Sequence, residues 1–529
     1  MSGNLPFSRP AFAGALFGLL ALAVAWGTGG LSPSLLNPDE GAHYVNALFL
    51  GDWVRAGLPS PMAFAQGFYA HFPRLSIGHW PPGWYLVQAP WFALARPSPW
   101  GALVASAFVA GLPAGVILWA CARCGKPWAG AATATAYVLS PLVVDAARHI
   151  LLDQPVALVV AAGAVAWRRA SERPSWSRLL VFGALAAAAP LVKGNGALIA
   201  LVPAIDLALT GRWRLLREPA LWGAAALAMA VVAPWYWLSF RISAGGFNYG
   251  PGPAYAALAL KANAQALHAN MGAAGLALAA WGAASAIRSG GEAGRIARLA
   301  LAVTLATLVF QSAVPVAIEP RYVAPLLPWT YALAGLGLSA LLDGARTRLL
   351  APAIGAAALA PATAGLWALP PKPDLGAPAL AEAMVRTGGV WLVDARAGGE
   401  GAVIAAAAHA DGGRRKVWAA RASQLLSTSD FMGRGYRLTA ADPAAARAVL
   451  DRLGANGAVV VAERGRLAYP HSRVLAGAVR GGGYALSLDR FAAGPGVTLL
   501  ARRNAAVAAR PGTPTHRSAN VGKMAAVLD

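Results

Sequence analysis

The chain has 529 residues, of which 57% are hydrophobic and 12% are charged, about half the charged fraction of an ordinary globular protein. This composition excludes a soluble protein for most of its length and predicts a polytopic α-helical membrane protein. The net charge of +22 does not indicate nucleic-acid binding, because the basic residues are scattered through short loops and form no continuous stripe.

Eleven apolar stretches are expected to span the membrane as helices. The first covers residues 11–28, after Arg9, and is interpreted as an uncleaved signal anchor, although Ala23-Val24-Ala25 is typical of a cleavage motif. The others cover residues 101–120, 129–147, 153–169, 178–192, 195–210, 220–240, 272–287, 298–317, 322–342 and 349–369.

Alternate loops between these stretches are basic, which predicts the orientation of the chain. The basic loops carry Arg123 and Lys126, then Arg168 to Arg178, Arg212 to Arg217, Arg288 to Arg298, and Arg346 with Arg348. The positive-inside rule places them in the cytoplasm with the N-terminus. We therefore expect a bacterial inner membrane protein whose segments 29–100 and 241–271, and all residues after 370, lie on the periplasmic side.

The segment from Pro81 to Ala95 is apolar but short, and Pro90 lies inside it. If it crossed the membrane, Asp39 and Asp153 would fall on opposite sides. Its aromatic residues suit the depth of the lipid headgroups. We interpret it as an interfacial helix.

The last 160 residues differ from the rest, because turn residues and charges become more frequent. Strand-like runs occur at residues 390–393, 458–461, 484–488 and 497–500, and a helix capped by Asp442 is expected at 443–453. This alternation predicts a small extracytoplasmic α/β domain over residues 370–503, after a membrane domain of residues 1–369. Residues 504–529 are expected to be a disordered tail.

Ionisable residues gather on the predicted outer side, at the ends of several helices. The acids are Asp39, Glu40, Asp153 and Glu319, and the bases are His79, Arg148, His149, Lys193 and Arg321, with Tyr322 beside the last. A carboxylate can act as general base toward a hydroxyl, and cations can bind a phosphate leaving group. The set therefore predicts a catalytic site on this side of the membrane.

Structural interpretations of single residues remain open. Asp39 and Asp153 are each placed to cap a following helix, Lys193 to end one, and Glu319 to pair with Arg321. Tyr322 and other aromatic residues are typical interface anchors. Cys121 and Cys124 are interpreted as ordinary thiols at a helix end.

Four motifs occur in the order found in one enzyme family: Asp39-Glu40, His79-Trp-Pro-Pro82, Arg148-His-Ile-Leu-Leu-Asp153 and Arg321-Tyr-Val-Ala-Pro-Leu-Leu-Pro328. Together they resemble integral-membrane GT-C glycosyltransferases of the protein O-mannosyltransferase and aminoarabinose (lipid A) transferase type. Two departures are Trp80 within the Pro-Pro motif and His149 in place of a common tyrosine.

The resemblance implies transfer of a sugar, with inversion, from a polyprenyl phosphate to a hydroxyl on the outer face. Asp39 would be the general base with Glu40 beside it, and Arg148 and Asp153 would shape the donor site. Lys193 and Arg321 are further candidates for binding the lipid phosphate, because of their charge and side. The acceptor, whether lipid, glycan or protein, stays open.

Two other function classes were weighed. A secondary transporter would have ionisable groups near helix midpoints, where this chain has mainly Asp206. A non-catalytic scaffold would not need the acids. No cofactor is identified with certainty: the acids Asp39, Glu40 or Asp153 could hold Mg²⁺ or Mn²⁺, and the same acids also suit metal-free chemistry.

Overall fold

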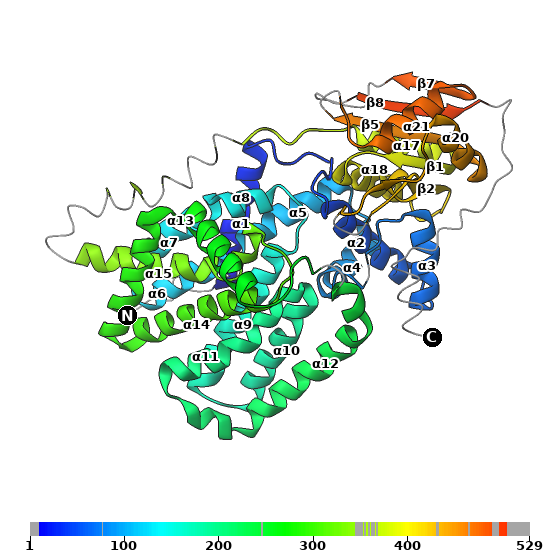
Figure 1. Cartoon of the computed structure of the whole chain (residues 1–529). Helices are drawn as coiled ribbons and strands as arrows, with labels where there is room; N and C mark the ends of the chain where they lie inside the picture. Colours follow the sequence, from blue (N-terminus) through cyan, green and yellow to red (C-terminus); the bar gives the residue numbers. More distant parts are fainter. Residues whose placement is uncertain are drawn as a thin grey trace.

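The computed structural model describes residues 10–504, apart from residue 77, residues 245–246, most of 344–368, and residues 430–432, 464–465 and 489–496. Figure 1 shows a helical region from the first two thirds of the chain and a smaller mixed domain from the last third. The last predicted membrane helix, residues 349–369, and the predicted tail lie outside the described residues.

The helical region follows the predicted stretches closely. Its helices are α1 (Pro10–Gly27), α5 (Pro99–Gly111), α6 (Ala114–Arg123), α7 (Pro127–Leu139), α8 (Pro141–Ala147), α9 (Asp153–Glu172), α10 (Trp176–Val192), α11 (Leu201–Thr210), α12 (Pro219–Ala244), α13 (Pro253–Ser289), α14 (Gly291–Ala313) and α15 (Leu327–Asp343), with the 3₁₀ helices η2 (Gly194–Ala200), η3 (Trp213–Arg217) and η4 (Pro320–Val323). The helical membrane fold predicted from composition is confirmed.

Four of the described spans are long and apolar enough to cross a membrane: Pro99–Arg123, Pro219–Ile242, Pro253–Ser289 and Gly291–Ala313. The predicted span 129–147 is instead two helices, α7 and α8, that meet at an angle of 61°. The predicted span 272–287 is the second half of α13, which is kinked at Gly272. The number of eleven spans stays a prediction.

Small residues allow these helices to pack closely. A Cβ atom at Gly282 of α13 would lie 1.9 Å from the Leu333 carbonyl oxygen of α15, and one at Gly337 would lie 2.1 Å from that of Leu278. Helices in a membrane depend on such close packing, because exchanging a lipid contact for a contact with another apolar side chain yields little free energy.

The basic loops expected on one side of the membrane do come together. Glu292 at the start of α14 pairs with Arg123 at 2.8 Å, with Arg168 at 2.6 Å and with Arg295 at 2.8 Å. These arginines lie in α6, α9 and α14, so the parts of these three helices that carry them lie together at one end of the helical region. This arrangement agrees with the alternation of charge along the sequence.

Three shorter helices, α2 (Glu40–Arg55), α3 (Pro61–His71) and α4 (Gly83–Ala95), join the helical region to the C-terminal domain. Every residue of α2 from Glu40 to Asp52 is buried, because α2 packs against both α4 and α18 (Ala397–Asp411). Figure 1 shows these short helices between the two parts.

The C-terminal domain contains a sheet in the order β2-β1-β5-β8-β7, with β6 beside β5. Strand β1 is parallel to β2 and β5, and β8 is antiparallel to β5 and β7. Its elements are α17 (Ala377–Thr387), β1 (Gly389–Asp394), α18, β2 (Val417–Arg421), α19 (Ala422–Leu425), β3 (Ser427–Thr428), β4 (Arg437–Leu438), α20 (Pro443–Arg452), β5 (Ala455–Glu463), β6 (Arg466–Leu467), α21 (Pro470–Arg480), β7 (Tyr484–Leu488) and β8 (Val497–Arg503).

Helices cover both faces of this sheet. Trp391 and Val393 of β1 face a core shared with α17 and α18, whereas Leu392 faces a second core with α20 and α21. The four predicted strands correspond to β1, β5, β7 and β8, and the Asp442 carboxylate accepts a hydrogen bond from the Ala445 amide as predicted for a cap. The predicted α/β fold of this region is confirmed.

The C-terminal domain is fixed to the helical region through α18 and α2. A Cβ atom at Gly41 would lie 2.7 Å from the Gly401 carbonyl, and one at Gly398 would lie 1.8 Å from the Leu36 carbonyl oxygen. Buried residues of α2 and α18, such as Leu48 and Val403, belong to one continuous apolar core. The site described next lies at this junction.

Candidate active site

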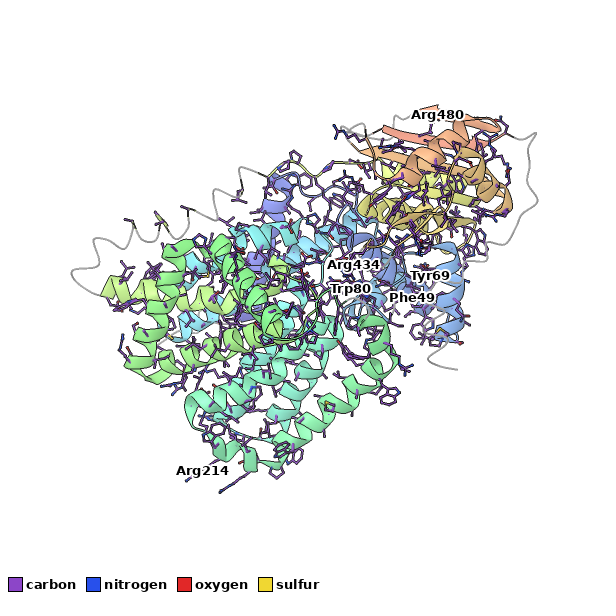
Figure 2. The ribbon with its side chains drawn as sticks, viewed as in Figure 1. Phe49, Tyr69, Trp80, Arg214, Arg434 and Arg480 are labelled. Carbon is purple, nitrogen blue, oxygen red and sulfur yellow. The ribbon has the colours of Figure 1, made fainter. Side chains whose placement is uncertain are left out.

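A cavity of about 3040 Å³ lies where the C-terminal domain meets the helical region. The helical region lines it with the loop before α2, the start of η2 and the segment around η4, and the C-terminal domain lines it with residues that follow β1 and β2. Figure 2 shows Trp80 and Tyr69 in this zone between the two parts. Ligand pockets commonly measure about 300–1,000 Å³, so the space suffices for two substrates.

Four charged side chains form a chain of alternating sign at the cavity. Arg321 Nη2 donates to Asp39 Oδ2 at 2.8 Å, and its Nε lies 4.0 Å from Asp153 Oδ2. Lys193 Nζ donates to Asp153 Oδ1 at 2.5 Å. Residues from three distant predicted motifs, and Lys193 from a fourth segment, therefore meet in one place.

The chain fold explains this convergence. Asp39 precedes α2, Asp153 is the first residue of α9, Lys193 follows α10 and Arg321 lies in η4. Each residue stands at the end of a helix, so none of these charges interrupts an apolar helix centre, and Asp39, Lys193 and Arg321 line the cavity. The charges consequently avoid the large cost of burial within lipid.

Asp39 is held ionised by its surroundings. Burial raises the pKa of Asp39, but the nearby charges of Arg321 and Lys193 and the hydrogen bond from Arg321 lower it, and the resulting pKa lies below its ordinary value. Burial lowers the pKa of His43 to about 3, so that imidazole is neutral at pH 7. Arg321 therefore supplies the positive charge that keeps Asp39 ionised.

Aromatic rings surround the ammonium group of Lys193. Its Nζ atom lies 5.0 Å from the centre of the Tyr322 ring and 5.9 Å from that of Trp80. Ring faces attract cations at these distances. Trp80, the residue that departs from the family motif, thus has a place beside the predicted phosphate-binding lysine.

Glu40 and Arg148 do not line this cavity. Glu40 is fully buried and accepts hydrogen bonds from Lys372 Nζ at 2.9 Å, the Asn37 amide at 2.9 Å and the Ile150 amide at 3.0 Å. The Arg148 guanidinium donates to the Pro370 carbonyl. The acidic pair is therefore divided: Asp39 faces the cavity, and Glu40 ties together three segments of the chain.

The remaining predicted site residues lie around the cavity. His79 and Glu319 line it, and His149 Nδ1 lies 3.4 Å from Asp145, which also lines it. Burial lowers the pKa of His79 despite the nearby charge of Asp39. Arg321 pairs with Asp39 and Asp153, so the alternative ion pair with Glu319 is not formed.

The capping alternatives are also resolved by geometry. Asp39 is the N-cap residue of α2, but its side chain makes no capping hydrogen bond. Asp153 lies inside the first turn of α9, after the N-cap residue Leu152, and its carboxylate contacts Lys193 instead. Neither carboxylate therefore caps its helix through its side chain.

Sequence reasoning missed two polar residues near this site. His43 Nδ1 lies 2.6 Å from the Tyr85 hydroxyl, one turn after Asp39. Asn195 lines the cavity, and within the described residues neither atom of its amide has a hydrogen-bond partner. The signals available in the sequence were that His43 lies four residues after Asp39 and that Asn195 lies two residues after Lys193.

The residues present do not fit a resident divalent cation. Asp39 and Asp153 are each paired with a basic side chain, Glu40 is enclosed by donors, and Asp145, which also lines the cavity, lies beside His149. Within residues 10–504, where described, no three His, Cys, Asp or Glu side chains come together as ligands. A cation needs several free oxygen ligands.

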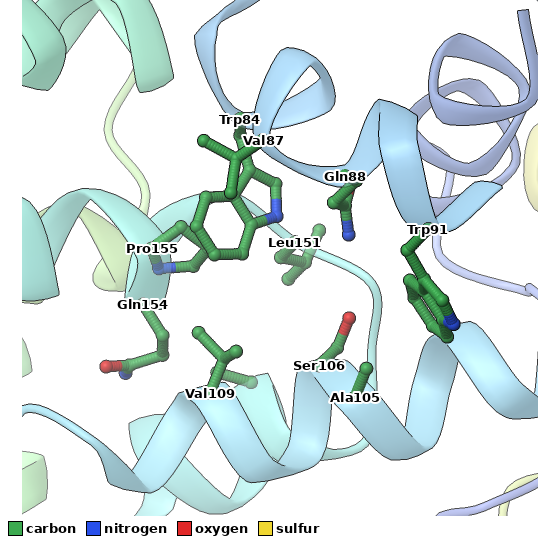
Figure 3. A pocket seen from close by; sticks show the side chains of 11 residues that line it. Trp84, Val87, Gln88, Trp91, Ala105, Ser106, Val109, Leu151, Gln154 and Pro155 are labelled. Carbon is green, nitrogen blue, oxygen red and sulfur yellow. The ribbon is translucent and has the colours of Figure 1, made fainter. Parts of the chain in front are cut away.

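A second, smaller pocket of about 150 Å³ lies between α4, α5 and α9. Figure 3 shows that Trp84, Val87 and Trp91 of α4 face Ser106 and Val109 of α5 across it. Leu151 lines this pocket and also the large cavity. Apolar side chains therefore continue from the charged site toward the outside of the helical region.

Comparison with known proteins supports the fold. Residues 79–237 match the family described as dolichyl-phosphate-mannose-protein mannosyltransferase. The structure of ArnT from Cupriavidus metallidurans bound to undecaprenyl phosphate superposes with a TM-score of 0.56 and 18% identity, covering 94% of this chain and 99% of that chain. Its apo structure gives 0.54 and 17% identity, covering 94% and 98%.

The oligosaccharyltransferase of Archaeoglobus fulgidus, tethered to an acceptor peptide, superposes with a TM-score of 0.52 and 12% identity, covering 85% of this chain and 69% of that chain. No curated protein sequence matches the chain significantly. The chain thus has the GT-C fold, and the resemblance seen in its motifs is confirmed.

Proposed function

We propose that this chain is an inverting membrane glycosyltransferase that takes a sugar from a polyprenyl-phosphate donor and transfers it to an acceptor hydroxyl. One observation carries the proposal: Asp39, Arg321, Asp153 and Lys193 form an ion chain at a cavity shared by membrane helices and an extramembranous domain. The GT-C fold and the family match over residues 79–237 support it. We place the protein in a bacterial inner membrane with the cavity on the periplasmic side.

In this proposal Asp39 is the general base. It accepts the proton of the acceptor hydroxyl while the oxygen attacks the anomeric carbon. The bond between that carbon and the phosphate oxygen breaks, and its electron pair stays on the phosphate. One displacement gives inversion, and the products are the glycosylated acceptor and the free polyprenyl phosphate.

Arg321 and Lys193 suit the charge change of this reaction. The donor phosphodiester carries about one negative charge, and the released monoester carries up to two. Cations that stabilise the charge developing on a leaving group lower the barrier. A phosphate that draws Arg321 toward itself also weakens the contact with Asp39, which makes Asp39 a stronger base when donor is bound.

The transporter alternative has less support. Asp206, the exceptional acid within a predicted span, lies four residues before the end of α11 and pairs with Arg212 at 3.0 Å. Trp167 also donates a hydrogen bond to it. These contacts give Asp206 a structural role near the end of its helix.

The test is transfer of labelled sugar from a panel of polyprenyl-phosphate sugars to membrane acceptors. Asp39→Asn should reduce transfer by at least about a hundredfold, since general-base catalysis contributes about 10²–10⁴-fold. The matched control is Asp145→Asn, which removes another carboxylate at the cavity that is 59% exposed and outside the ion chain. Equal transfer by wild type and Asp39→Asn would refute the assignment, and EDTA should leave wild-type transfer unchanged.

A further inference from the structure

The carboxyl edge of the C-terminal sheet forms the wall of the cavity opposite the ion chain. Ala395 follows β1, Arg421 ends β2, and both line the cavity. From β1 the chain crosses to β2 on one side and later returns to β5 on the other. In open α/β sheets, ligands bind at the carboxyl ends of strands where the order reverses in this way.

Three nearly parallel rings stand at this edge. The centroids of Tyr469 and His471 are 5.1 Å apart with planes at 18°, and Tyr436 lies 5.9 Å from His471 with planes at 28°. All three residues line the cavity. Aromatic faces in a polar pocket suit a ligand that has both apolar faces and hydroxyl groups.

Polar contacts of His471 help to hold these rings in place. His471 Nδ1 lies 3.0 Å from the Tyr436 hydroxyl, and His471 Nε2 lies 3.1 Å from Asp394 Oδ1 at the end of β1. His471 and Asp394 are almost fully buried. The Tyr436 ring is therefore positioned before any ligand arrives, which reduces the entropic cost of binding.

Polar groups lie beside the rings. Glu400 accepts from Arg421 Nε at 2.6 Å and from the Ser423 hydroxyl at 3.0 Å. Arg74 Nη2 donates to the Ala397 carbonyl at the start of α18, and Arg74 and Asp39 both line the cavity.

We infer that this edge, with Tyr436 and Tyr469 as its aromatic faces and Glu400, Arg421 and Arg74 as its polar groups, is the acceptor subsite and that its ligand is a carbohydrate. A sugar offers apolar C–H faces to the rings and hydroxyl groups to the charged side chains, and Asp39 receives the proton of the hydroxyl that reacts. The inference rests on the proposed function and names its acceptor class.

The test uses the full chain in lipid vesicles with labelled polyprenyl-phosphate sugar. Neutral oligosaccharides, unmodified serine-containing peptides and diacylglycerol are offered as acceptors. We expect transfer to the oligosaccharides. Tyr436→Ala and Tyr469→Ala should each raise the acceptor KM roughly threefold to tenfold and leave the donor KM unchanged, since an aromatic contact contributes about that factor. The matched variants Tyr436→Phe and Tyr469→Phe should retain most of the affinity.

A second readout does not depend on turnover. Equilibrium binding of a labelled neutral oligosaccharide is measured on the full chain carrying Asp39→Asn, with and without Tyr469→Ala. Binding that weakens with Tyr469→Ala supports the subsite. Absence of binding, or transfer by wild type to peptide or diacylglycerol alone, overturns it. Absence of transfer by wild type with intact oligosaccharide binding would instead count against the proposed function.

Discussion

At the scale of residues, the site depends on how charges are paired. Asp39 and Asp153 are both adjacent to Arg321, so one guanidinium links the proposed base to the buried pair of Asp153 and Lys193. The side chains of that pair are 1% and 6% exposed. A buried pair loses much more when one partner is removed than when both are replaced.

This pairing predicts the result of substitutions at Lys193. Lys193→Met leaves the buried Asp153 carboxylate with only the 4.0 Å contact to Arg321 Nε and should lower the free energy of unfolding by about 3–5 kcal/mol. Adding Asp153→Asn removes the uncompensated charge and should recover most of that loss without recovering transfer. Thermal unfolding in detergent and transfer assays on the folded fraction measure the two effects separately. A double variant no more stable than Lys193→Met would contradict the explanation.

The lowered pKa of Asp39 predicts the pH dependence of transfer. A base with a depressed pKa stays deprotonated until the pH falls through that pKa, so kcat/KM should show no acidic limb from Asp39 between pH 7 and 5. Arg321→Gln removes a charge that lowers the pKa and should move the limb to higher pH, along with a loss of rate. The pH profile of the residual activity tests this, and an unchanged limb would count against the Arg321 contact.

Residue types and helix ends allowed much of this site to be predicted from sequence. Asp39, Asp153, Lys193 and Arg321 were predicted from their charge and from their expected position on the outer side of the membrane. The sequence did not show which way a side chain points. Glu40 and Arg148 are close to site residues in the sequence or in a motif, but their side chains face the domain junction. Lys372, the partner of Glu40, is more than three hundred residues away in the sequence. No local sequence pattern therefore predicts this contact.

At the scale of elements, α2 and α18 determine how the two parts join. Glu40 at the start of α2 accepts a hydrogen bond from Lys372, and Gly398 at the start of α18 lies against the backbone of Leu36. The junction therefore combines an ion pair with close backbone contact. Neither the ion pair nor the backbone contact is required for the proposed transfer reaction.

The role of Glu40 can be separated from that of Asp39. Glu40→Gln should destabilise the protein by about 3–5 kcal/mol, because the ammonium of Lys372 would be left buried without its charge partner. The molecules that remain folded should keep kcat within a few-fold of wild type. Thermal unfolding and single-turnover transfer provide the two measurements. A Glu40→Gln variant that is stable but inactive would contradict this structural role and indicate that Glu40 takes part in catalysis.

Close packing at Gly398 gives an independent prediction. A methyl group there would lie 1.8 Å from the Leu36 carbonyl oxygen, so Gly398→Ala must displace backbone and should cost about 1–3 kcal/mol of stability. Gly250→Ala is the control, because a Cβ atom at Gly250 meets no atom within 4 Å and its φ is not positive. Equal melting temperatures for the two variants would contradict the tight junction.

The positions of the helices and strands were predicted better than the bends within the helices. Apolar length and charge alternation located the helical stretches, and short β-branched runs located β1, β5 and β8. The break between α7 and α8 and the kink at Gly272 were missed, since a single Ser-Pro step or glycine within an apolar run is also common in continuous membrane helices. Tertiary packing decides these cases.

At the scale of the whole molecule, the cavity belongs to neither part alone. Its ion chain comes from the helical region, and its aromatic and polar edge comes from the C-terminal sheet. The continuous core through α2 and α18 holds the two walls in register. A change at the junction should consequently affect acceptor affinity even when no cavity residue is altered.

The placement of the cavity also separates the binding sites of the two proposed substrates. Under the proposed reaction, the phosphate of the lipid carrier meets the ion chain of the helical region, and the acceptor meets the edge of the C-terminal sheet. The two substrates therefore occupy different walls of one cavity, so a substitution in one wall should change the affinity for one substrate and leave that for the other unchanged.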